Sequence, residues 1–245
     1  MLSRRTLLVG GGAVPVATLL RATAADAKPI VLSDPTVRTH GPVMQIGDSL
    51  SGGFVGGLNT ELVARRVGPF RCDIQGSRSI TREPNKKYPS GLTAVRSARA
   101  AGFDPPSWVV ALGCNDMWFI ARKKGIATEM IDKILTEIGP DRHVFFLTYW
   151  QKQNGAWPKF NEALRGATHQ WPNLRVADWA ALAKQHPEWH GADGAHYNRK
   201  GAKARNTYLV DTMIKAAKAA KASTSVPRRA GPGRPSSLSA RPHMT

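Results

Sequence analysis

The residues with the clearest chemical potential in this sequence are one serine and one histidine. Ser49 lies in the tetrapeptide Gly-Asp-Ser-Leu at positions 47–50, directly after the apolar run 43–46, where a strand would end and a helix begin. A serine hydroxyl becomes a good nucleophile only when a base accepts its proton. His196 is the candidate base because, among the seven histidines, it alone has an aspartate, Asp193, three residues before it. That carboxylate can orient the imidazole and stabilise its protonated form, which predicts nucleophilic chemistry on an ester.

Two further fragments lie between the serine and the histidine. Gly76 follows a strand-like run, and Asn115 belongs to the run Gly-Cys-Asn-Asp at positions 113–116. Glycine lets the backbone come close to a substrate, and an asparagine amide can donate to a negative oxygen. Taken alone, Gly76 could be a turn glycine, and Asn115 and Asp116 could cap the next segment, a role we expect for Asp116. The order Ser, Gly, Asn, Asp, His favours one shared site.

In this order and at these distances, the motifs resemble the GDSL, or SGNH, hydrolase superfamily over residues 42–213. The resemblance implies that Ser49, Asp193 and His196 are catalytic. It implies an oxyanion hole formed by the backbone N–H groups of Ser49 and Gly76 and by the side-chain amide of Asn115. It also implies reaction through an acyl-serine intermediate, with no cofactor.

We therefore predict an exported serine esterase that hydrolyses small acyl esters, most simply acetyl esters, on cell-envelope glycans or lipids. An O-acetyltransferase acting on a cell-wall polysaccharide is the alternative, because residues 176–179 and 193–202 resemble SGNH domains of cell-surface O-acetyltransferases. A non-catalytic cell-wall-binding module is a third candidate, and the intact set of motif residues argues against it. The spacing of His190, Asp193 and His196 would also suit a metal, but no further ligand cluster accompanies it, so no metal is expected.

The elements that must position these residues alternate between strand and helix. Apolar, strand-like runs occupy 43–46, 70–74, 108–112, 144–148 and 174–177, and stretches of helical pattern occupy 58–67, 91–101, 126–138, 160–171 and 200–219. This alternation predicts an α/β fold of three α/β/α layers, with a five-stranded parallel sheet in the flavodoxin-like order 2-1-3-4-5. Ser49, Gly76 and Asn115 then follow the first, second and third strands. They would meet at the switch point where such sheets bind ligands.

The chain divides into three segments by composition. Residues 1–27 resemble a twin-arginine export signal, with Arg4 and Arg5 before an apolar stretch; an ordinary secretory signal and an uncleaved anchor are the alternatives. Residues 28–221 form the predicted SGNH hydrolase domain. Residues 222–245 are a basic Pro/Ser-rich tail that we expect to be disordered.

The formal net charge is +18, with an isoelectric point near 10.6. Because no nucleic-acid-binding motif accompanies this charge, electrostatic association with an anionic cell envelope is the better expectation. Part of the charge is expected on the solvated face of a last helix, at Arg199, Lys200, Lys203, Arg205, Lys215, Lys218 and Lys221. Cys72 and Cys114 are expected near the ends of neighbouring strands, where they could be free thiols or one disulfide; the sequence leaves both open.

Overall fold

The computed structural model describes residues 30–32, 42–52, 61, 65, 67–83, 88–153 and 155–225. The predicted export signal and the C-terminal tail beyond Ser225 lie outside these residues. So does most of the helix expected over 58–67.

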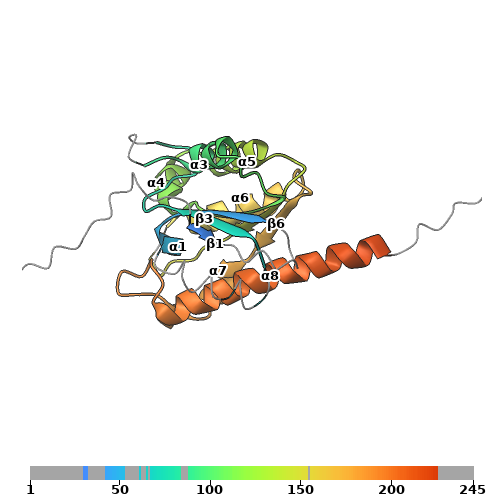
Figure 1. Cartoon of the computed structure of the whole chain (residues 1–245). Helices are drawn as coiled ribbons and strands as arrows, with labels where there is room; N and C mark the ends of the chain where they lie inside the picture. The colour runs from blue at the N-terminus through green and yellow to red at the C-terminus, as the bar shows by residue number, and fades with distance from the viewer. Residues whose placement is uncertain are drawn as a thin grey trace, which may run out of the picture.

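A single twisted sheet forms the middle layer (Figure 1). Its strands are β1 (Ile30–Leu32), β2 (Val43–Gly47), β3 (Phe70–Ile74), β4 (Ser107–Ala111), β5 (His143–Leu147) and β6 (Leu174–Ala177). They lie side by side in the order β1-β3-β2-β4-β5-β6. The five strands from β2 to β6 are parallel, which confirms the predicted order 2-1-3-4-5. The short edge strand β1 pairs antiparallel with β3 and was not predicted.

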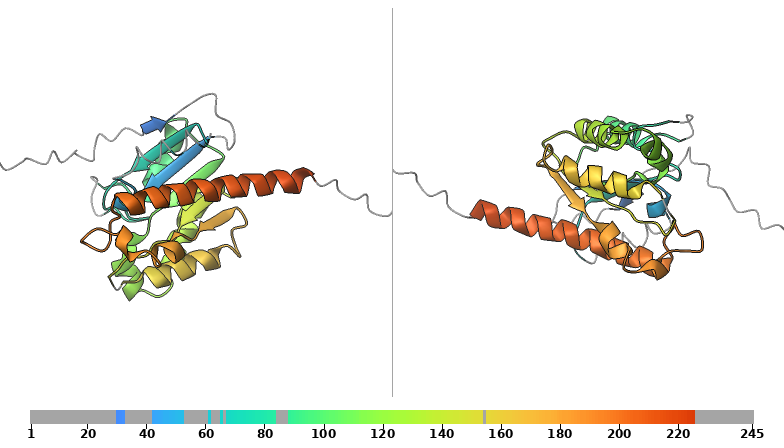
Figure 2. Two further views of the ribbon diagram at one scale, coloured as in Figure 1. Left: turned by 90° about the horizontal axis from the view of Figure 1, so that it is seen from below. Right: turned by 180° about the vertical axis from the view of Figure 1, so that it is seen from behind.

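Helices cover both faces of the sheet (Figures 1 and 2). On one face lie α3 (Gly91–Ala100), α4 (Met117–Arg122), α5 (Ile126–Ile138) and α6 (Trp157–Ala167). On the other lie α1 (Ser49–Gly52), α7 (Trp179–Ala183) and α8 (Arg199–Ser225). Every residue of β2 and β4 is buried, as expected for central parallel strands with covered faces.

Helix α8 is the longest element and extends past the body of the molecule (Figures 1 and 2). Leu209, Val210 and Met213 anchor its inner face against the sheet residues Val109 and Phe145 in one apolar cluster. The helix continues through Ser225, into the segment predicted to be a disordered tail. In the described part of the chain, no helix combines the length and apolarity needed to cross a bilayer.

The main differences from the predicted elements are short or terminal. The helices α4 and α7 were not expected, and α6 begins at Trp157 rather than residue 160, with a proline in its first turn where this residue is well tolerated. Cys72 and Cys114 are both free thiols. The expectation that they lie on neighbouring strands is wrong, because β2 runs between β3 and β4.

Candidate active site

The turn after β2 presents the serine. Asp48 is buried, and its carboxylate accepts hydrogen bonds from the Leu50 backbone N–H at 2.9 Å and from the Cys114 thiol at 3.1 Å. Burial is the main cause that raises the pKa of Asp48 above its ordinary value. A side chain on Gly47 would collide with Ile74, since an added Cβ would lie 2.7 Å from its Cδ1. The turn is therefore tight, and it leaves Ser49 at the carboxyl edge of the sheet.

The structure brings Ser49, His196 and Asp193 together although 147 residues separate the first two. The His196 Nε2 atom lies 3.0 Å from the Ser49 Oγ, and Nδ1 lies 2.6 Å from the Asp193 Oδ2. The other Asp193 oxygen accepts from the backbone N–H groups of Ala195 and His196, each at 3.0 Å. These hydrogen bonds lower the pKa of Asp193 to about 2, and the bond from the His196 side chain has the largest effect. The carboxylate therefore stays ionised wherever histidines titrate.

The loop that carries the acid and the base is held by the segment after β5. The Gln153 side-chain amide donates to the Asp193 carbonyl oxygen at 2.8 Å, and the Lys152 backbone N–H donates to the Gly194 carbonyl oxygen at 2.9 Å. Within the loop, the Gly191 N–H donates to the His196 carbonyl oxygen at 2.8 Å. Sequence reasoning did not single out Gln153, because its role depends on a contact between distant segments.

Gly76 lies in an exposed turn directly after β3. The turn is tied to the serine segment, because the Gln75 N–H donates to the Gly47 carbonyl oxygen at 3.1 Å. A Cβ added to Gly76 would meet no protein atom within 4 Å, and the residue does not need a positive φ. Nothing in the described protein therefore requires glycine at this position. Its lack of a side chain matters only if another molecule approaches the turn.

Replacing Gly76 by alanine should therefore separate stability from activity. The fold should be equally stable or more stable by up to about 1 kcal/mol, because alanine restricts the unfolded chain. Ester turnover should fall by about 100-fold, the scale of a substrate displaced by about 1 Å. Thermal unfolding and steady-state hydrolysis measure the two effects.

Gly166→Ala is the matched control, since an added Cβ at this α6 position also meets no atom within 4 Å. This variant should keep full activity. Equal activity in the two variants would show that no substrate passes close to Gly76.

Asn115 lies in a 3₁₀ turn, Cys114–Asp116, directly after β4. Its side-chain nitrogen donates to the Arg78 carbonyl oxygen at 3.1 Å and lies 3.4 Å from the Cys114 sulfur. The amide has two N–H donors and sulfur is a weak acceptor, so one N–H anchors the side chain and the other can serve a stronger acceptor. Asn115 is partly exposed, as a residue that meets a substrate must be.

The aromatic core supports this turn from beneath. Gly113 has a φ of 121°, which L side chains rarely adopt, and an added Cβ would lie 2.7 Å from the Phe160 ring. The Tyr149 hydroxyl donates to the Gly113 carbonyl oxygen at 3.0 Å. Tyr149 and Phe160 pack together with ring centroids 5.3 Å apart. The start of the Asn115 turn is thus fixed by core packing and one hydrogen bond.

Asp116 does not cap the following helix, contrary to expectation. It is fully buried and points to another segment, where its Oδ2 accepts from the Ile80 backbone N–H at 3.0 Å. Burial is the largest cause that raises the pKa of Asp116 to about 6. Asp116 therefore joins the loop after β3 to the turn after β4.

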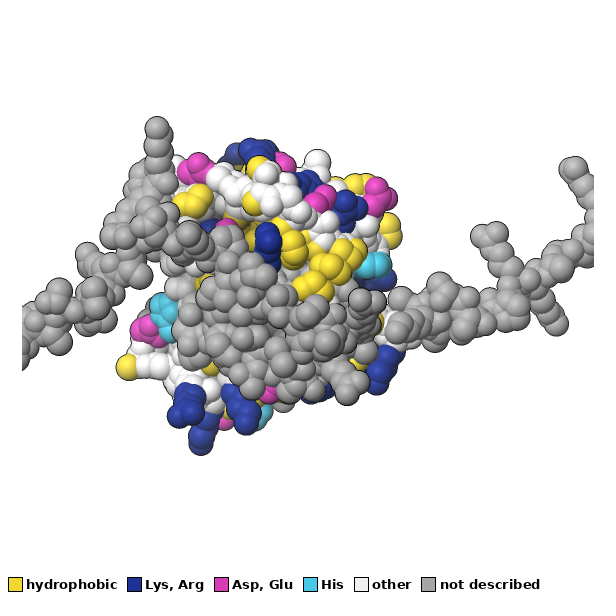
Figure 3. All heavy atoms as spheres, viewed as in Figure 1, with side chains coloured by type: hydrophobic (Ala, Val, Ile, Leu, Met, Phe, Trp, Pro, Cys, Tyr) yellow, Lys and Arg dark blue, Asp and Glu magenta, His cyan; other side chains and the backbone are white. Residues whose placement is uncertain are grey.

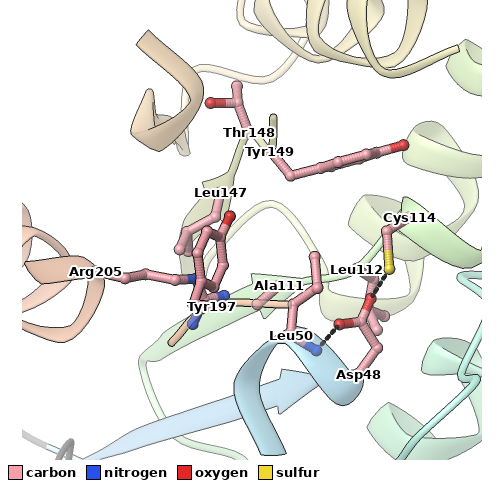
Figure 4. Close-up of a pocket in the computed structure, with 10 residues that line it drawn as sticks. All are labelled: Asp48, Leu50, Ala111, Leu112, Cys114, Leu147, Thr148, Tyr149, Tyr197 and Arg205. Carbon is pink, nitrogen blue, oxygen red and sulfur yellow. Dashed lines mark hydrogen bonds between the residues drawn. The ribbon is translucent and has the colours of Figure 1, made fainter. Parts of the chain in front are cut away.

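A cavity lies behind the serine turn, between Asp48 and Cys114 on one side and Arg205 and Tyr197 on the other (Figure 4). Its volume of about 10 Å³ is close to the space that one water molecule needs. Arg205 was expected on the wet face of α8 but is only 5% exposed, and it donates to the Ser51 hydroxyl at 3.1 Å. The positive charge of Arg205 lowers the pKa of Asp48 and so partly offsets the effect of burial.

His190 is also buried, and its Nε2 lies 3.2 Å from the Trp150 carbonyl oxygen. Its ring packs edge-on against the Trp150 ring, with centroids 5.0 Å apart. Across the residues that the structure describes, no group of three or more His, Cys, Asp or Glu side chains is arranged to hold a metal ion.

The three-layer topology is the fold of solved structures described as GDSL-like or SGNH hydrolases. One similar structure is the C-terminal catalytic domain of peptidoglycan O-acetyltransferase A from Streptococcus pneumoniae, determined with a methylsulfonyl adduct. It has a TM-score of 0.55 and 21% identity, over 75% of this chain and 96% of that one. A family 3 carbohydrate esterase from Talaromyces cellulolyticus has a TM-score of 0.55 and 20% identity, over 73% of this chain and 98% of that one.

The sequence comparison reaches less far. No protein-family model matches the chain. A segment of 55 residues is 40% identical to YrhL of Bacillus subtilis, which is named as a candidate peptidoglycan O-acetyltransferase. The match covers 22% of this chain and 9% of that protein, so the chain spans only a small part of this relative's length.

Proposed function

We propose that this protein is a serine hydrolase that cleaves small acyl esters, acetyl esters above all, on cell-envelope glycans or lipids. The observation that carries the proposal is the chain of two hydrogen bonds from Ser49 through His196 to Asp193. Such an arrangement supplies a nucleophile, its base and the group that orients the base. The similar solved structures, which include carbohydrate esterases, support the same chemistry.

The reaction would proceed in two halves. The Ser49 Oγ attacks the ester carbonyl carbon while the His196 Nε2 takes the hydroxyl proton, and Asp193 stabilises the imidazolium that forms. The carbonyl oxygen becomes negative and accepts from the backbone N–H groups of Ser49 and Gly76 and from the Asn115 amide. The carbon–oxygen bond to the alcohol then breaks, and the alcohol leaves with the proton from His196. Water, deprotonated by His196, attacks the acyl-serine and releases the acid.

A glycan is the favoured carrier of the ester. The two relatives named above are described by their action on peptidoglycan, and the family 3 esterases by action on carbohydrate. Trp118 lies one helical turn beyond Asn115, and its side chain is 58% exposed. The Arg122 guanidinium stacks 4.0 Å from the Trp118 ring centroid and also donates to the Trp118 carbonyl oxygen at 3.0 Å. An exposed, braced ring three residues after Asn115 offers a flat surface on which a sugar ring can stack.

Hydrolysis is favoured over transfer by the openness of the site. The side chains of His196 and Asp193 are 51% and 53% exposed, so water reaches the groups that would activate it. Transfer to a sugar hydroxyl by the same intermediate is the second candidate, because two of the relatives are named as O-acetyltransferases. A transferase would need its acceptor to occupy this opening and displace water.

The decisive assay offers the purified protein nitrophenyl acetate, with and without added peptidoglycan oligomers. Release of nitrophenol with matching release of acetate supports hydrolysis. Release of nitrophenol with acetylated sugar detected by mass spectrometry supports transfer. If nitrophenol is released no faster than in buffer, with or without the oligomers, the result counts against both the hydrolase and the transferase.

We further propose export by the segment 1–27, a hydrolase domain over 28–221, and electrostatic association with an anionic envelope. Lys and Arg side chains lie along the top and bottom of the face in Figure 3. The exposed basic residues of α8 are Arg199, Lys200, Lys203, Lys215 and Lys218. Export that persists after Arg4 and Arg5 are changed to lysine would exclude the twin-arginine route. Binding to cell walls that does not weaken as salt is added would exclude electrostatic association.

A further inference from the structure

Arg78 is a buried arginine with an unusual number of partners. Its side chain is 1% exposed, and its guanidinium makes five hydrogen bonds. The Nε atom donates to the Pro89 carbonyl oxygen at 3.2 Å, and Nη1 donates to the carbonyl oxygens of Asp73 at 2.7 Å and Gly47 at 3.4 Å. The Nη2 atom donates to the carboxylate of Asp73 at 2.7 Å and to the Gln75 side chain at 3.2 Å.

These partners belong to the two segments that would supply the backbone donors of the oxyanion hole. Gly47 ends β2, two residues before Ser49. Asp73 is near the end of β3, and Gln75 directly precedes Gly76. Arg78 therefore bridges the segment that carries the Ser49 N–H and the segment that carries the Gly76 N–H. The β2–β3 ladder and the Gln75 N–H bond to the Gly47 carbonyl oxygen already hold these segments together, and the planar guanidinium adds a second connection between them.

The backbone of the same residue holds the third donor. The Arg78 carbonyl oxygen accepts from the Asn115 side-chain amide at 3.1 Å. This bond uses one of the two amide N–H groups and thereby fixes the direction of the other. The Asp116 bond to the Ile80 N–H holds the same loop against the turn after β4.

We propose that Arg78 is a positioning residue of the oxyanion hole: its guanidinium, added to the backbone ladder between β2 and β3, fixes the spacing of the Ser49 and Gly76 N–H groups, and its carbonyl orients the Asn115 amide. This inference rests on the proposed esterase function. Arg78 touches no substrate, because its side chain is enclosed by protein.

Arginine suits this position for a geometric reason. Its guanidinium presents five N–H donors in a rigid plane, whereas lysine presents three on a single rotatable nitrogen. A lysine at position 78 could keep the positive charge beside Asp73, but it could not reach the carbonyl oxygens of Gly47 and Pro89 at the same time. Arg78→Lys thus preserves the charge and removes the bridge.

The kinetic experiment compares wild type, Arg78→Lys and Arg78→Met on nitrophenyl acetate. Because oxyanion donors act on the transition state, kcat should fall by about 100-fold in both variants, the scale found for one lost or displaced donor, while KM changes little. The pH profile should keep its midpoint, because Ser49, His196 and Asp193 make no hydrogen bond to the Arg78 side chain.

The matched control is Arg99→Met. Arg99 also ties segments together, by donating to the carbonyl oxygens of Glu137 and Ile138 and pairing with Asp104, but at the opposite edge of the sheet. The Arg99→Met variant should have a lower unfolding temperature than the wild type and an unchanged kcat. If Arg78→Lys folds and its kcat stays within about threefold of that of Arg99→Met, the proposal is overturned. A threefold difference is far smaller than the fall of about 100-fold expected when one oxyanion donor is displaced.

A second measurement does not depend on turnover. In NMR spectra of the ¹⁵N-labelled protein, Arg78→Lys should shift the backbone signal of Gly76 and the side-chain signals of Asn115, and Arg99→Met should leave them in place. Unmoved signals would overturn the positioning role even in a protein that cleaves esters. If Arg78→Lys shifts these signals but the wild type cleaves no ester, the positioning role stands and the proposed function is overturned instead.

Discussion

Ser49→Ala should reduce kcat for nitrophenyl acetate by about 10⁶-fold, the scale seen when the nucleophile of a serine triad is removed. The Oγ that this change deletes is the atom 3.0 Å from the His196 Nε2, and among the described residues no other serine is hydrogen-bonded to that ring. The loss should therefore leave only the rate that oxyanion donors and binding give to attack by water. Fixed-time assays at high protein concentration would measure the residual rate.

Ser97→Ala, at an exposed position on α3, is the matched control and should retain the full rate. A sulfonyl fluoride should add one sulfonyl group to the wild type, as judged by intact mass, and none to the Ser49 variant. Comparable turnover by the two proteins would mean that a different group attacks the ester, and the proposed mechanism would be wrong.

Asp193→Asn should lower kcat by about 10⁴-fold while the fold stays intact, as expected when a triad histidine loses its carboxylate. An asparagine oxygen could still accept the N–H groups of Ala195 and His196 that the aspartate holds at 3.0 Å. Its amide nitrogen, however, would donate to the His196 Nδ1. The ring would then carry its proton on Nε2, where it could no longer accept the proton of Ser49.

Asp104→Asn is the appropriate control, since Asp104 pairs with Arg142 far from the site. The wild-type carboxylate should remain charged until the pH falls towards about 2, because hydrogen bonding holds the pKa of Asp193 there. An acid limb of the activity profile near neutrality must therefore come from another group. Retention of more than about a tenth of the wild-type kcat by Asp193→Asn would be far above the expected loss and would remove Asp193 from the mechanism.

The central strands could be predicted because β2 and β4 are buried on both faces and their sequences are largely apolar. The predicted limits 70–74 and 174–177 also coincide with β3 and β6, which are only partly buried. The edge strand β1 has three residues and no periodic pattern to reveal it. The helices α4 and α7 have only six and five residues, too few to show an amphipathic repeat.

The candidate site could be predicted only in part, and the reason is chemical. Attack by a serine requires particular residue types, so Ser49, Asp193 and His196 stand out, and the structure brings their side chains into contact. The groups that hold them are generic polar residues. Neither Arg78 nor Gln153 has a signature in the sequence, because what distinguishes them is burial or a bond to a distant segment.

The support of the Asn115 turn by the rings of Phe160 and Tyr149 has a consequence for protein engineering. Residues that fill the interior usually tolerate exchange for others of similar volume at a modest energetic cost. Here the same rings support the turn that carries Asn115, so an exchange in the core that left the melting temperature unchanged could still impair turnover. For this protein, thermal denaturation alone would be a misleading screen.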